Sequence, residues 1–111
     1  DKGTDPAEKI QRALALVIEA RTVLGDDPTS VSMLPYSAKR LLEIQSAINA
    51  LHLPETPAGK AIDSFAIRLR AAAWSWQKID TSAEVLLPFE VKTIHRLNTE
   101  ACDILTTFKT P

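Results

Sequence analysis

The sequence predicts an all-α fold, an antiparallel up-down four-helix bundle whose fourth helix is kinked or broken near Pro88. Four segments repeat apolar residues at spacings of three and four, as amphipathic helices do. Prolines and capping residues separate these segments, and none alternates apolar with polar residues as a strand would. The 111 residues suit a single helical-bundle domain, 5–111, preceded by a flexible segment of residues 1–4.

The first helix is expected from Pro6 to Leu24. Asp5 can cap it, Pro6 suits the first helical position, and Glu8 stands where a capping-box carboxylate would reach back. Gly25 offers a stop. The apolar stripe of this helix consists of Ile10, Ala13, Leu14, Val17, Ala20 and Leu24.

Residues 26–35 read as a connection, because Asp27-Pro28 and Leu34-Pro35 both disfavour a helix. The second helix follows from about Pro35 to His52. Its residues expected in the core are Leu41, Ile44, Ala47, Ile48 and Leu51.

The third helix is expected from about Pro57 to Ile79, with Thr56 as its cap and Pro57 at its first position. Its core stripe is Ile62, Phe65, Ala66, Leu69, Ala72, Ala73, Trp76 and Ile79.

The fourth helix is expected to continue to about Lys109, after a capping box made by Thr81 and Glu84. Pro88 interrupts its first two turns. Either the helix kinks there, or a single turn precedes a main helix that starts at Pro88. The stripe comprises Leu86, Leu87, Val91, Ile94, Leu97, Ala101, Ile104, Leu105 and Phe108.

Composition excludes several classes of function. Thirteen basic and fourteen acidic residues leave a net charge of −1, which argues against nucleic-acid binding. Apolar stretches of about six residues are too short for membrane insertion. One cysteine excludes an internal disulfide framework and a cysteine-based zinc site. Three glycines leave no phosphate-binding loop.

No motif for catalysis, a metal or a cofactor stands out. His52 and His95, the only histidines, lack the Glu-x-x-His and His-x-x-x-His spacings of metal sites. Cys102 falls at the edge of an apolar stripe and has no cationic neighbour in the sequence, so we interpret it as structural. We therefore expect no catalytic residues, no metal and no cofactor.

The third helix carries the most informative feature. If Trp76 points into the core, Trp74 must point nearly the opposite way. Ile67 shares that outer stripe, and Arg70 and Lys78 frame it. An aromatic and an aliphatic residue inside a polar rim are typical of a protein interface, so these four are the predicted partner-binding residues. The alternative is an internal cover formed by Val31, Met33 and Leu34.

These observations favour a non-enzymatic protein-binding module: an adaptor, inhibitor, immunity or assembly factor. Its partner would be another protein or a second copy in a homodimer. The alternative is a small helical enzyme or ligand-binding bundle with an interior polar pocket around Arg21 and Glu90, which intrude on apolar faces. The start at Asp1 suits both a mature exported protein and a trimmed domain, so the compartment stays open.

Overall fold

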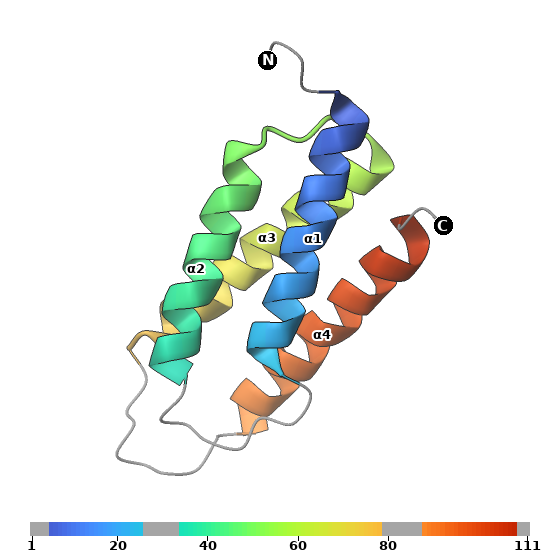
Figure 1. Cartoon of the computed structure of the whole chain (residues 1–111). Helices are drawn as coiled ribbons and strands as arrows, with labels where there is room; N and C mark the ends of the chain where they lie inside the picture. Colours follow the sequence, from blue (N-terminus) through green and yellow to red (C-terminus); the bar gives the residue numbers. More distant parts are fainter. Residues whose placement is uncertain (1–4, 26–33, 79–87, 109–111) are drawn as a thin grey trace.

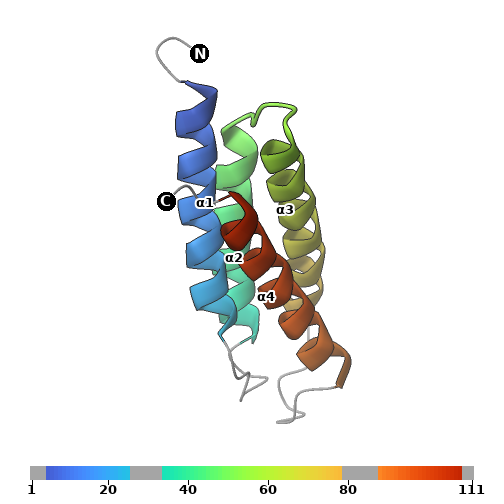
Figure 2. The same cartoon turned by 90° about the vertical axis from the view of Figure 1, so that its right-hand side faces the viewer.

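The computed structural model describes residues 5–25, 34–78 and 88–108, and within these ranges it contains four α-helices and no β-strand. The helices are α1 (Pro6–Leu24), α2 (Leu34–Ala50), α3 (Pro57–Trp76) and α4 (Pro88–Phe108). The predicted all-α class is therefore confirmed. Figures 1 and 2 show that the end of α1, the start of α2, the end of α3 and the start of α4 lie at one end of the molecule.

Helix α1 begins and ends where the sequence predicts. The Asp5 carboxylate accepts a hydrogen bond from the amide of Ala7 at 3.1 Å, and Gly25 ends the helix with a φ of 74°. The expected capping box was wrong. The Glu8 carboxylate instead accepts a hydrogen bond from Arg12, one turn further on, at 3.0 Å, because a guanidinium four residues away on the same face competes for it.

Helix α2 starts one residue earlier than expected and ends at Ala50 rather than His52. His52 adopts a left-handed backbone conformation with a φ of 51°, which cannot continue the helix. The assignment of Ala47 to the core was wrong, because this residue is exposed and points about 100° away from the buried Ile48. Ala38 lies in the core instead.

Helices α3 and α4 each start at a proline. Thr56 caps α3 by accepting a hydrogen bond from the amide of Gly59 at 3.1 Å, and Pro57 is the first helical residue. Helix α3 ends at Trp76, and Ile79 lies outside the described residues. Helix α4 starts at Pro88. This start agrees with the alternative in which the main helix begins at Pro88. The expected capping box and first turn, at residues 81–87, lie outside the described residues.

The buried apolar side chains of all four helices form one cluster. Helices α2 and α3 share the most extensive contact, while α1 also packs against α2 and α4, and α3 against α4. The core consists of Ala13, Leu14, Val17, Ala20, Leu24, Ala38, Leu41, Ile44, Ile48, Ile62, Phe65, Ala66, Leu69, Ala73, Trp76, Ile94, Leu97, Ala101 and Ile104. The helical stripes in the sequence therefore predict most of this core.

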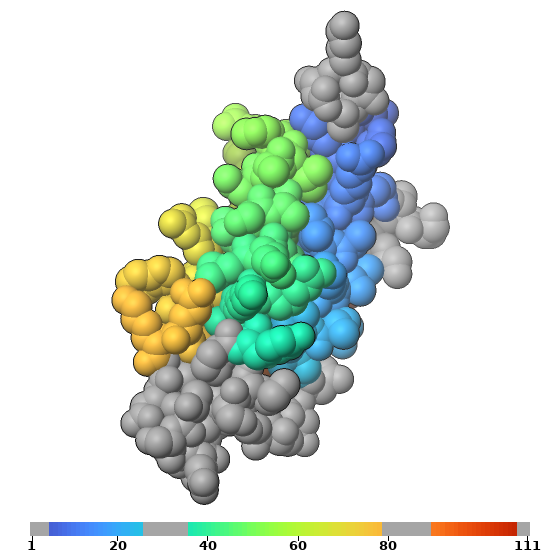
Figure 3. Space-filling view, turned by 60° about the vertical axis from the view of Figure 1, so that its left-hand side comes forward, coloured from blue at the N-terminus to red at the C-terminus, as the bar shows by residue number. Residues whose placement is uncertain are grey.

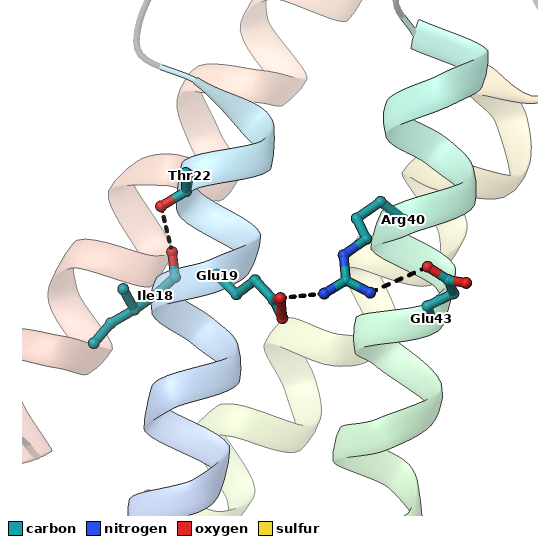
Figure 4. A network of polar contacts seen from close by, with 5 residues as sticks. All are labelled: Ile18, Glu19, Thr22, Arg40 and Glu43. Carbon is teal, nitrogen blue, oxygen red and sulfur yellow. Dashed lines mark hydrogen bonds and ion pairs between the residues drawn. The ribbon is translucent and has the colours of Figure 1, made fainter.

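An ion pair on the surface links α1 to α2 (Figure 4). Arg40 of α2 donates hydrogen bonds to Glu19 of α1 and to Glu43 on its own helix, the latter at 3.2 Å. The hydrogen bond to Glu43, followed by the interaction with Glu19, raises the pKa of Arg40 above its usual value. Because all three side chains face solvent, this network orients the two helices more than it stabilises them.

A second ion pair links α3 to α4. The Arg68 guanidinium donates two hydrogen bonds to the Glu100 carboxylate, from Nε to Oε1 at 2.8 Å and from a terminal nitrogen to Oε2. Such a bidentate pair fixes direction as well as distance. The hydrogen bond to Glu100 raises the pKa of Arg68, so the guanidinium stays charged at any ordinary pH.

Replacement of the buried tryptophan should destabilise the fold strongly. Only 2% of Trp76 is exposed. We expect Trp76→Ala to lower the free energy of unfolding by about 3–5 kcal/mol, because a large side chain is lost and a cavity remains. Urea denaturation followed by circular dichroism measures this loss. A loss below about 1 kcal/mol would show that Trp76 is not a core residue.

Gly59 should not tolerate alanine, although alanine is the better helix former. A Cβ on Gly59 would overlap the carbonyl oxygen of Pro54 and approach its carbonyl carbon to 3.1 Å. We expect Gly59→Ala to destabilise the protein by about 1–3 kcal/mol, because the backbone at Pro54 or Gly59 would have to move to relieve the overlap. Helix propensity alone predicts that Gly59→Ala stabilises the protein. A higher melting temperature for this variant would therefore contradict the close approach between Gly59 and the Pro54 carbonyl.

Candidate protein-interaction face on helix α3

One side of α3 presents large apolar and charged residues to solvent. We call Asp63, Ile67, Arg70, Trp74 and Lys78 the α3 face. At 100° per residue the first four positions fall within about 60° of arc, on the side of the helix away from its buried stripe, and Lys78 lies in the turn that follows Trp76. Ile67 is 67% exposed and Trp74 is 55% exposed. They are two of the four large hydrophobic residues that the described part of the chain exposes.

The two tryptophans of α3 lie in opposite environments. They are two residues apart, so their side chains leave the helix about 200° apart. Trp76 packs in the core, and Trp74 faces solvent. This arrangement agrees with the helix phase that the sequence predicts.

Lys78 contacts the Trp74 ring directly. Its ammonium nitrogen lies 3.5 Å from the centroid of the ring. Lys78 lies in the turn that follows Trp76, which brings its ammonium back over the ring, and the ring quadrupole attracts the cation. Arg70, one turn before Trp74, is also exposed. The tryptophan is thus flanked by a cation on each side along the chain, one in α3 and one in the turn after it.

A surface pocket of about 440 Å³ adjoins the α3 face where α2 and α3 meet. Its lining residues are Gln45, Asn49, His52, Leu53, Asp63, Ala66 and Ile67. Partial burial here raises the pKa of the Asp63 carboxyl. The ionised carboxylate is therefore penalised in the folded state, and this penalty disappears as the pH falls through the raised pKa.

The outer position of α3 is visible in the space-filling view (Figure 3), where the later part of α3, in yellow and orange, forms the edge of the molecule beside α2. Val31 and Met33, the expected cover of Trp74, lie outside the described residues. Leu34 is the first residue of α2. The alternative that this segment covers Trp74 therefore stays a prediction.

The structure places Arg21 and Glu90 in different surroundings. Arg21 is exposed and lines two surface pockets between α1 and α4, and Glu90 lines neither of them. Glu90 lies in the first turn of α4 and is only 8% exposed, and its Oε2 is buried without a hydrogen-bond partner. A carboxylate near the positive end of a helix is partly compensated by the helix dipole.

A residue that the sequence reasoning missed joins α1 to α4. The amide nitrogen Nδ2 of Asn98 donates a hydrogen bond of 2.6 Å to the carbonyl oxygen of Gly25, while its Oδ1 is buried without a partner. Asn98 lines a pocket of about 230 Å³ together with Arg21, His95, Thr99, Cys102 and Asp103. His95 is exposed and Cys102 is half-buried. No local sequence signal identifies Asn98, because its partner lies 73 residues away.

Residues 5–25, 34–78 and 88–108 contain no group of three or more His, Cys, Asp or Glu side chains placed to hold a metal ion. None of their helices combines the length and apolar content that a membrane span needs. No protein-family model, curated protein sequence or solved structure matches this chain. Its function must therefore be inferred from its own residues.

The exposure of the two tryptophans can be measured separately. Excitation selective for tryptophan reports on Trp74 alone in Trp76→Phe and on Trp76 alone in Trp74→Phe. We expect acrylamide to quench Trp74 several-fold more strongly than Trp76, because Trp74 is 55% exposed and Trp76 is 2% exposed. Equal quenching of the two folded variants would show that Trp74 is covered.

Proposed function

We propose that this chain is a non-enzymatic protein-binding module that acts as an adaptor, inhibitor, immunity or assembly factor and binds its partner through the α3 face. The observation that carries the proposal is the exposure of Ile67 and Trp74 on one side of a helix whose opposite side is buried. Arg70 and Lys78 would form the polar rim of the interface.

We further propose that residues 5–111 form one domain, an antiparallel up-down four-helix bundle. Each helix contacts the next along the chain, and α4 contacts α1, as in a closed ring of four helices. The ends of α1 and α3 and the starts of α2 and α4 lie at one end of the molecule (Figure 1). Such a bundle would hold α3 as a rigid support for the interface.

The composition of the α3 face suits protein recognition. Tryptophan and arginine are enriched among the residues that contribute most to binding, and they act best when surrounded by groups that exclude water. A tryptophan in a helix has few rotatable bonds, and its contact with Lys78 restrains it further. Trp74 would therefore lose little conformational entropy on binding.

Truncation of Trp74 should weaken binding without unfolding the protein. We expect Trp74→Ala to reduce affinity for the partner by about thirtyfold or more, equal to about 2 kcal/mol, because the central aromatic contact is lost. The melting temperature should change little, since Trp74 does not belong to the core. A pull-down with the native protein identifies the partner, and isothermal titration calorimetry compares the variants.

The matched control is Tyr36→Ala, which removes an aromatic residue that is 73% exposed on α2. This control should bind as the native protein does. The proposal is wrong if Trp74→Ala binds with native affinity, or if it unfolds the protein as severely as Trp76→Ala.

A further inference from the structure

A surface pocket of about 300 Å³ lies between α3 and α4, which pack against each other (Figure 2). Its apolar lining consists of Ala71, Ala72, Trp76 and Leu97. Because Ala71 is exposed and Trp76 belongs to the core, the pocket leads from the surface to the edge of the core. Protein sites for small molecules combine such an apolar lining with a few polar groups that orient the ligand.

The polar groups of this pocket favour an anion. Among the described residues that line it, two are cationic and none is acidic. The cations are Arg68 of α3 and Arg96 of α4, and Ser75 and Thr93 add hydroxyl groups. An anion that entered the pocket would therefore meet positive charge and hydrogen-bond donors beside an apolar surface.

Arg96 is the charged group that stays available for a ligand. Its side chain is exposed and forms no ion pair with a carboxylate among the described residues. Glu100, one turn further along α4, has the spacing for such a pair. Both oxygens of the Glu100 carboxylate accept hydrogen bonds from Arg68 instead. A guanidinium presents parallel N–H donors that match the two oxygens of a carboxylate, so Arg96 can bind one from solution.

The pocket is already open without a ligand. The α3 residues that face it between Arg68 and Trp76 have small side chains, namely Ala71, Ala72 and Ser75. One turn away, the bidentate pair of Arg68 with Glu100 holds α3 against α4. A ligand would therefore enter without the cost of separating the helices.

We propose that this pocket between α3 and α4 binds a short-chain carboxylate, with the apolar chain along Ala72, Trp76 and Leu97 and the carboxylate on Arg96. One available guanidinium suits one negative charge. The volume lies at the small end of the range for ligand pockets, which suits a free molecule with a short chain. This binding site goes beyond the proposed function.

The pocket and the α3 face lie on different sides of α3. Arg68 and Ser75 leave the helix about 100–120° from Trp74, on the side that meets α4. The α3 face instead adjoins the pocket that α3 forms with α2. The two sites can therefore be tested independently of each other.

Octanoate tests the proposal in a nuclear magnetic resonance titration of the nitrogen-15-labelled full chain. We expect saturable shifts with a dissociation constant of about 1 mM, because a ligand with few atoms gains little binding free energy in a surface pocket. The two indole N–H signals locate the ligand. The signal of Trp76, which lines the pocket, should move, and that of Trp74 should stay in place. The variant Trp74→Phe assigns the two signals.

Three related compounds separate the contributions of charge and chain. Acetate has the carboxylate without the chain and should give no saturable shift at millimolar concentrations, since the apolar contact is missing. Octanol and octylammonium have the chain without the negative charge. Each should bind about fivefold or more weakly than octanoate, because neither forms a charge-assisted pair with Arg96.

A variant of Arg96 tests the residue directly. Arg96→Gln should raise the dissociation constant for octanoate by about fivefold and leave that for octanol unchanged, because only the carboxylate needs the guanidinium. The matched control is Lys39→Gln, which removes a positive charge from an exposed position on α2 and should bind octanoate as the native protein does. Circular dichroism confirms that each variant is folded.

Four results overturn the proposal. They are octanoate that gives no saturable shift, a shift of the Trp74 indole in place of the Trp76 indole, octanol that binds as tightly as octanoate, and Arg96→Gln that binds octanoate with native affinity. None of these results bears on the α3 face, which Trp74→Ala tests separately.

Discussion

The close approach between the first turn of α3 and the link that precedes it is the constraint on which the rest of the structure depends. The Gly59 amide donates to the Thr56 hydroxyl, and the Cα of Gly59 lies against the Pro54 carbonyl. A side chain at residue 59 would meet the Pro54 carbonyl, so only glycine lets the first turn of α3 lie this close to the link. The helical period carries this orientation to the other end of α3, where Trp76 enters the core and Trp74 faces solvent.

Local chemistry explains why the helix starts could be predicted. A cap followed by proline acts through neighbouring residues only, so Asp5 and Thr56 behave as the sequence indicates. The end of α2 could not be predicted in the same way, because His52 adopts its left-handed conformation in the link to α3. Ala47 was misplaced for a related reason, since a small apolar side chain fits an exposed face as well as a buried one.

In the candidate site, too, the features set by neighbouring residues could be predicted from the sequence, and those set by contacts between helices could not. The helical period alone places Ile67 and Trp74 on one side of α3, so the sequence suffices to propose the α3 face. The surroundings of Arg21 and Asn98 depend on how α1 meets α4, and no pattern along one helix contains that information.

The two arginines of α3 lie on different sides of the helix and in different surroundings. Arg68 and Arg70 are two residues apart, so their side chains leave the helix about 200° apart. Arg68 is held by Glu100 and joins α3 to α4, whereas Arg70 lies on the exposed face. The tryptophans divide in the same way, with Trp76 in the core and Trp74 outside. Because the contacts that fix α3 lie away from its exposed face, a partner bound there, as we propose, would leave in place the contacts that hold the helix.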